Sequence, residues 1–172
     1  MWVFSYGSLM GDGWEKRFEC QRRSIADLKG YERSFTKASI RNWGSRVHPA
    51  PTLRIIRREV GICRGVAFEF PQGQKEHVTE YLKGREGKLF TQVSVPMVLN
   101  DGEHANAITF IYEGKNIIAA SNVDEIASLA RRSEGTDGTG LDYIKSVRKT
   151  LADEDIQDIA VESLWSAIAD VQ

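Results

Sequence analysis

The chain has 172 residues, with 23 basic and 24 acidic side chains and a formal net charge of -1. A chain of this length usually folds around one core, so we expect a single domain spanning residues 1–172. The apolar fraction of 41% excludes a chain that is disordered throughout, and the balanced charge excludes an overall field that would attract nucleic acid or anionic lipid.

The cysteines and the lengths of the apolar runs bear on the compartment. Cys20 and Cys63 stand in a chain that has neither a secretory apolar segment nor an apolar run of about 18 residues. We therefore expect reduced thiols, no membrane contact and a cytoplasmic location.

Alternating apolar and polar residues predict strands through the first two thirds of the chain. In the stretch ICRGVAFEF, Val66, Phe68 and Phe70 share one face. Turn residues separate the predicted strands, and such short connections favour antiparallel pairing. This pattern predicts a curled sheet or small barrel of about six strands: Trp2–Phe4, Tyr31–Lys37, Thr52–Arg57, Ile62–Phe70, Phe90–Leu99 and Ala107–Tyr112.

Helical spacing appears between Lys75 and Arg85 and again after Ser121. Within 75–85 the apolar side chains recur at i, i+3 and i+4, which predicts one short helix. After Ser121 the same period predicts three helices, the last of them capped by Asp153. The glycine-rich loop EGTDGTG at 134–140 divides the first two of these. Together the elements indicate an α+β fold.

The first strand ends in a small polar turn formed by Tyr6, Gly7, Ser8 and Leu9. A strand that stops there leaves backbone N–H groups without ladder partners, and such groups can point into one concavity that binds an anion or oxyanion. An ordinary strand-to-loop turn is the alternative. The turn alone does not decide between the two.

A second candidate site residue is Glu86, in the stretch YLKGREG at 81–87. A carboxylate at the end of a helix feels the negative end of the backbone dipole, which favours its protonated form and suits proton transfer. The alternatives are a solvated surface acid or a structural partner of Arg85.

The turn and the glutamate together resemble the γ-glutamylcyclotransferase family, and its ChaC-like branch most closely. The resemblance covers most of the chain. It rests on WVFSYGSLM at 2–10, LKGYERSF at 28–35, GICRGVAFEF at 61–70, YLKGRE at 81–86 and, more weakly, DEIASLARRSEGTDGTGLDYI at 124–144.

The resemblance implies a small antiparallel barrel with flanking helices and a cavity where the YGSL turn meets the glutamate. In this family the α-amine of a γ-glutamyl compound attacks its own γ-carbonyl, which forms 5-oxoproline and releases the attached amine. The usual substrate of the ChaC-like branch is glutathione, and the products are 5-oxoproline and cysteinylglycine. No cofactor or metal is implied, and His48, His77 and His104 have no ligand spacing.

These implications assign roles to particular residues. Glu86 is expected to be the general base and acid, and the backbone amides of Gly7, Ser8 and Leu9 to bind the substrate and its developing charge. Arg41 suits a substrate carboxylate. For Tyr6 and Tyr143 substrate contact and core packing remain equally open.

Departures from the family pattern leave the substrate open. The segment Arg41-Asn42-Trp43-Gly44 replaces an Asp-His-Arg-Gly type motif, Phe90 stands where a tyrosine is common, and Gly140 replaces an asparagine. The expected partner is a small γ-glutamyl compound rather than nucleic acid, and the oligomeric state is undetermined. A different γ-glutamyl substrate, or a binding module without catalysis, remains an alternative.

Overall fold

The computed structural model describes residues 1–120 and 122–169. The helix over Lys75–Arg85 and the three helices of the last third of the chain are confirmed, with bounds that differ by a few residues. The elements are β1 (Trp2–Ser5), the 3-10 turns η1 (Ser8–Met10) and η2 (Trp14–Arg17), β2 (Arg22–Ser39), β3 (Ala50–Glu69), η3 (Gln72–Gln74), α1 (Lys75–Glu86), β4 (Phe90–Leu99), β5 (His104–Tyr112), α2 (Val123–Arg132), α3 (Gly140–Asp153) and α4 (Ile159–Ala169).

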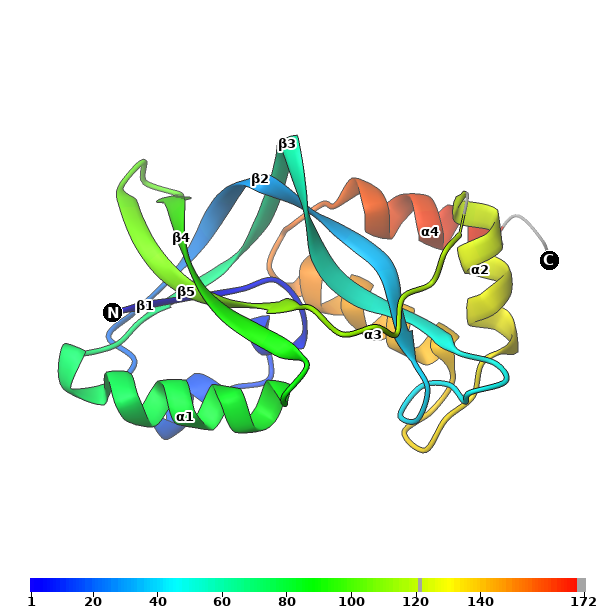
Figure 1. The fold of residues 1–172 in the computed structure, drawn as a ribbon. Helices are drawn as coiled ribbons and strands as arrows, with labels where there is room; N and C mark the ends of the chain where they lie inside the picture. Colours follow the sequence, from blue (N-terminus) through cyan, green and yellow to red (C-terminus); the bar gives the residue numbers. More distant parts are fainter. Residues whose placement is uncertain (121, 170–172) are drawn as a thin grey trace. The chain divides into compact units, whose positions relative to one another are not determined.

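The strands close into a barrel in the order β1-β3-β2-β4-β5, which confirms the predicted small barrel (Figure 1). β1 is antiparallel to β3, and β4 is antiparallel to β5, whereas β1 and β5 run parallel. The barrel is therefore mixed rather than wholly antiparallel. It has five strands because the two predicted strands Thr52–Arg57 and Ile62–Phe70 both belong to β3, whose backbone stays extended through residues 58–61.

The chain divides into two compact units. The barrel unit comprises Met1–Glu32 and Ile55–Gly114, and the helical unit comprises Arg33–Arg54 and Lys115–Gln172. The expectation of a single domain for residues 1–172 stays a prediction.

The interior of the barrel unit is a continuous apolar cluster. Alternate side chains of each strand supply it, as expected where one face of a sheet is buried. The cluster comprises Trp2, Phe4, Ala26, Leu28, Tyr31, Ile55, Cys63, Ala67, Val95, Met97, Leu99 and Ala107.

A second apolar layer covers the outer face of β1 and β3. Trp14 of η2 packs against Phe68 and Phe70, with ring centroids 5.5 Å away in both cases, and its ring stacks on Tyr81 of α1 at 6.3 Å. Since Phe68 pairs with Val3 in the sheet, this layer lies on the side of β1 opposite the barrel interior. Trp14 of η2 therefore packs between the outer face of the sheet and α1, the helix that runs along one side of the barrel in Figure 1.

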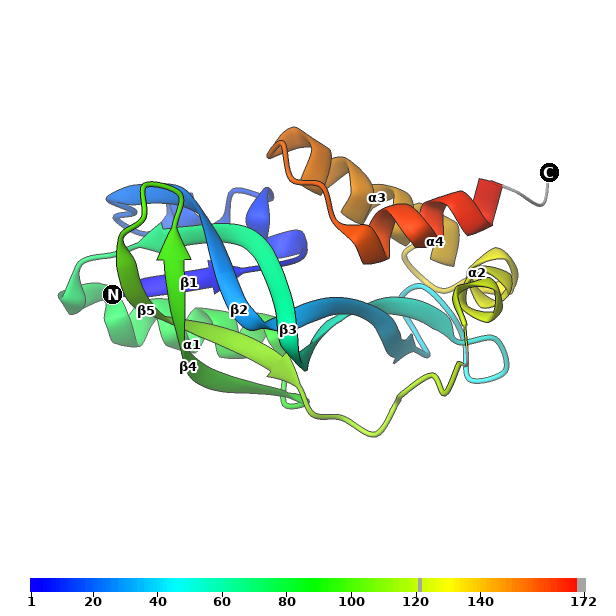
Figure 2. The same ribbon diagram turned by 90° about the horizontal axis from the view of Figure 1, so that it is seen from above.

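The helical unit packs α2, α3 and α4 against one another (Figure 2). The predicted cap at Asp153 is wrong, because this residue ends α3. Asp158 caps α4 instead: its Oδ1 accepts hydrogen bonds from the N–H groups of Ala160 and Val161. Its Oδ2 accepts a 2.8 Å bond from the fully buried guanidinium of Arg33, which joins the start of α4 to β2.

Candidate active site

The Tyr6–Leu9 segment forms a tight turn at the end of β1. Gly7 caps η1, and its carbonyl accepts a 2.9 Å bond from the N–H of Met10. The amides of Ser8 and Leu9 therefore stand at the start of a helical turn, where backbone donors have no partner inside the helix. The side chains of Leu9 and Met10 are buried, so the turn is anchored on one side while Ser8 is exposed on the other.

Trp14 is the main anchor of this turn. Its side chain is 3% exposed, and its Nε1–H donates a 2.9 Å bond to the carbonyl of Leu9. The same ring stacks on Tyr81, so one residue contacts both the YGSL turn and α1.

Glu86 is the last residue of α1. The chain leaves the helix at Gly87, which adopts φ 81° and donates its N–H to the carbonyl of Lys83. A left-handed φ of this kind is easy only for glycine, which explains why the helix ends there. Val78, Leu82 and Glu86 follow one another at i, i+4 and i+8, so the half-buried carboxylate continues the buried stripe of the helix.

An ion pair ties this helix end to the N-terminal loop. The guanidinium of Arg85 binds the carboxylate of Asp12, which lies two residues after the end of η1. Partial burial by itself lowers the pKa of Arg85, but the hydrogen bond and the negative charge of Asp12 outweigh it and raise the pKa above its ordinary value. Arg85 therefore stays charged. It directly precedes Glu86 and ties the end of α1 to the loop that follows the YGSL turn.

Tyr6 points away from this layer, toward the barrel interior. Its ring packs against the interior cluster, and its hydroxyl donates a 2.8 Å bond to the carbonyl of Phe110. The structure thus gives Tyr6 a packing contact and a hydrogen bond to β5, and its contact with substrate stays a prediction.

Arg41 and Tyr143 lie in the helical unit. Arg41 is exposed and lines a hollow of about 500 Å³ with residues of the glycine-rich loop. The hydroxyl of Tyr143 accepts a 3.0 Å bond from the N–H of Leu53, and its ring lies 5.5 Å from that of Trp43. Their roles in substrate binding stay predictions.

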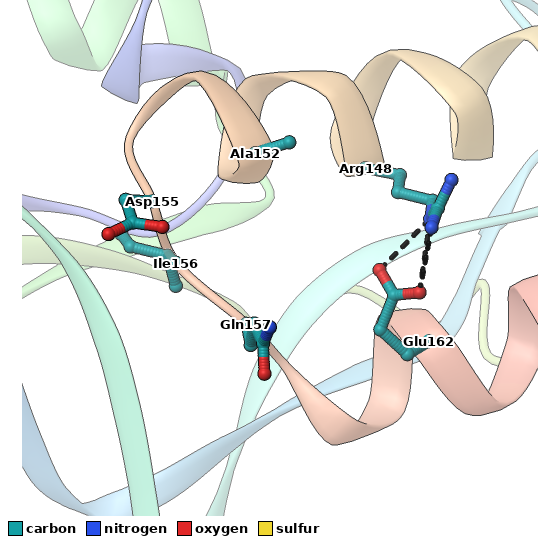
Figure 3. A pocket seen from close by; sticks show the side chains of 6 residues that line it. All are labelled: Arg148, Ala152, Asp155, Ile156, Gln157 and Glu162. Carbon is teal, nitrogen blue, oxygen red and sulfur yellow. Dashed lines mark hydrogen bonds and ion pairs between the residues drawn. The ribbon is translucent and has the colours of Figure 1, made fainter.

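The helical unit also holds a cavity of about 390 Å³ where α3 meets α4. Figure 3 shows two of its lining residues, Arg148 and Glu162, joined by hydrogen bonds from the guanidinium to the carboxylate. None of the residues predicted for the site lines this cavity, whose lining is Arg148, Ala152, Asp155, Ile156, Gln157 and Glu162.

Sequence reasoning missed Asp12 and Trp14 and treated Arg85 only as a possible partner of Glu86. The signal was faint: the stretch GDGW directly follows YGSLM, and an acid and an aromatic residue there carry no distinctive pattern. Their role depends on α1, which lies more than 60 residues further along the chain.

The fold defines a class of proteins. The chain matches the crystal structure of a γ-glutamyl cyclotransferase specific to glutathione from yeast with a TM-score of 0.82, over 100% of this chain and 96% of that chain, at 19% sequence identity. At this identity the match establishes the fold, which is that of the γ-glutamylcyclotransferases.

The family follows from the sequence comparisons. Residues 1–171 match the family model described as ChaC-like protein, and the chain belongs to this family. It is 29% identical over 174 residues to the glutathione-specific γ-glutamylcyclotransferase of Escherichia coli, covering 98% of this chain and 72% of that protein. It is 26% identical over 179 residues to γ-glutamylcyclotransferase 2-3 of Arabidopsis thaliana, covering 98% of this chain and 88% of that protein. Among the described residues, every helix is too short or too polar to cross a membrane.

Proposed function

We propose that this protein is a γ-glutamylcyclotransferase that converts a γ-glutamyl compound, with glutathione as the first candidate, to 5-oxoproline and the released amine. Membership of the ChaC-like family and the name of the Escherichia coli relative support this substrate class. The observation that carries the proposal is the ion pair between Arg85 and Asp12, which holds the end of α1, with Glu86, to the loop that follows the YGSL turn.

The reaction requires proton transfer and charge stabilisation. Glu86 takes a proton from the α-ammonium group, and the resulting amine attacks the γ-carbonyl carbon. The amides of Gly7, Ser8 and Leu9 stabilise the negative charge that develops on the carbonyl oxygen. As the carbon–nitrogen bond to the leaving group breaks, protonated Glu86 returns its proton to the leaving nitrogen. The attacking nitrogen, now part of the ring, sheds a second proton, which goes to the released amine.

No water molecule is consumed, because the nucleophile belongs to the substrate. The protein mainly has to hold the γ-glutamyl group folded, with its amine against its own carbonyl. We also propose a cytoplasmic location, since glutathione and reduced thiols belong to a reducing compartment.

The test is formation of 5-oxoproline by the wild-type chain and by Glu86→Gln, with glutathione, γ-glutamyl amino acids and γ-glutamyl amines as parallel substrates. Glu86→Gln keeps the shape of the side chain but cannot exchange a proton, so we expect an intact fold and no product. Glu80→Gln, at an exposed acid of the same helix, is the matched control and should keep full activity. Undiminished activity of Glu86→Gln, or a wild-type chain that binds a γ-glutamyl compound and forms no product, would refute the proposal.

A further inference from the structure

Three buried side-chain atoms of the described residues have no hydrogen-bond partner: Ser5 Oγ, Thr79 Oγ1 and Gln92 Oε1. Nearly all buried polar atoms in proteins have a partner, so an unpartnered one is a candidate for a ligand contact. All three belong to the barrel unit, and two of them share one row of the sheet.

Ser5 and Gln92 flank the same residue of β5. Gln92 of β4 pairs with Phe110 across the antiparallel ladder, so their side chains lie on one face. The parallel register of β1 and β5 pairs Val3 with Ile108, and the Thr109 hydroxyl donates a 2.9 Å bond to the carbonyl of Phe4. We infer from this offset that Ser5 lies level with Phe110. Ser5, Phe110 and Gln92 therefore form a row of side chains across three adjacent strands, which we call the polar row.

The polar row faces α1 rather than the barrel interior. Tyr6, Val93 and Ile111, each next in sequence to a member of the row, pack against the interior cluster. Because successive side chains of a strand point to opposite faces, the row points to the outer face. That is the face which η2 and α1 cover.

Both ends of the polar row lie next to the predicted active site. Ser5 directly precedes the Tyr6–Leu9 turn. At the other end, the N–H of Phe90 donates to the carbonyl of Gly87, so β4 starts immediately beyond the helix end that carries Glu86. Gln92 is two residues further, roughly 7 Å along the strand. The row therefore begins beside the turn and ends on the strand that follows the helix of Glu86.

The chemistry of the amide oxygen indicates what it would bind. Gln92 Oε1 accepts hydrogen bonds and cannot donate one. The strongest donor in a γ-glutamyl group is its α-ammonium, which has three N–H bonds and must approach Glu86 for the reaction to begin. Glu86 requires one of these bonds, which leaves others for a second acceptor.

We propose that Gln92 is a substrate-binding residue whose side-chain oxygen accepts a hydrogen bond from the α-ammonium group of the substrate. This inference rests on the proposed function. It adds a residue that orients the attacking amine without exchanging protons, and it explains why an amide oxygen is buried there with no partner in the described part of the chain.

The test variant is Gln92→Met, which keeps an unbranched side chain and removes the acceptor. With glutathione as substrate we expect the KM to rise about tenfold or more, because a hydrogen bond to a charged group is lost, and the kcat to change less. The melting temperature without ligand should hold or rise, since a buried polar atom has been removed. A structural role would lower the melting temperature and leave the KM unchanged, which would overturn the proposal.

A ligand without the amine locates the contact. Glutaryl-cysteinylglycine lacks the α-amine of glutathione and cannot cyclise, so it is measured as a competitive inhibitor. Gln92→Met should change its inhibition constant less than twofold while raising the KM for glutathione. Equal weakening of both ligands would place Gln92 elsewhere on the substrate and would overturn the assignment.

Two further variants complete the design. Thr79→Val removes an unpartnered buried hydroxyl two helical turns before Glu86, about 10 Å away, and should leave the KM unchanged. Gln92→Leu replaces Gln92→Met if the latter does not fold, and unfolding of both would make Gln92 a structural residue and overturn the inference. A wild-type chain without activity on any γ-glutamyl compound would refute the proposed function itself, whereas an active wild type with an unaltered Gln92→Met would refute this inference alone.

Discussion

Replacing Trp14 with phenylalanine should loosen the YGSL turn. The indole N–H donates a 2.9 Å bond to the Leu9 carbonyl in a site that is 3% exposed. Phenylalanine cannot donate, so this carbonyl would be buried without its partner, at a cost of about 1–3 kcal/mol. The smaller ring also leaves a void among Phe68, Phe70 and Tyr81, which adds about 1 kcal/mol. We expect a total loss of about 2–4 kcal/mol in the free energy of unfolding.

The assay is urea unfolding together with kcat/KM for 5-oxoproline formation. Because the turn carries the amides assigned to the oxyanion, a displacement of the Leu9 carbonyl should also lower kcat/KM by roughly tenfold. Trp165→Phe is the matched control: the ring is only half-buried, and the guanidinium of Arg148 lies over it at 5.1 Å, so the expected loss is below about 1 kcal/mol. Equal losses in the two variants would refute the reasoning.

Two predictions concern the helical unit. Asp158→Ala should lower the free energy of unfolding in urea by about 3–5 kcal/mol, because the fully buried guanidinium of Arg33 loses the carboxylate that faces it. Asp158→Asn can still cap α4 and should recover about 1 kcal/mol of this loss. An alanine variant as stable as the wild type would contradict the prediction. The side chain and backbone of Thr139 donate hydrogen bonds that lower the pKa of Asp142 below its ordinary 3.8. The capping box of α3 should therefore persist at neutral pH and be lost only as the pH falls through this lowered pKa. A midpoint at or above 3.8 in an NMR titration of Asp142 would argue against the prediction.

Local sequence was enough to predict most helices and strands, and to predict the YGSL turn and the helix end at Glu86. Strand alternation and helical spacing predicted a small barrel followed by three helices, and the stretch YLKGREG predicted a helix that ends at the glutamate. These features depend on neighbouring residues: the period of the side chains, and a glycine that adopts a left-handed φ where the helix stops.

Long-range hydrogen bonds were not predictable in the same way. The prediction divided β3 into two strands because residues 58–61 looked like a break in the sequence, whereas the backbone stays extended there. The cap of α4 was misplaced because Asp153 and Asp158 are both plausible capping residues in sequence. Only the packing of α4 against its unit, with Arg33 on the other side of Asp158, distinguishes the two.

The amino-acid sequence by itself determined the class of fold, the YGSL turn and the position of Glu86 on a helix end. Only the tertiary structure decided what joins them: the pairing of Arg85 with Asp12, the Trp14 contact with both Leu9 and Tyr81, and the sheet register that brings Ser5 and Gln92 into one row. The physical reason is that strand register and ion pairing between distant segments depend on how the whole chain closes, whereas periodicity and helix termination depend on a few adjacent residues.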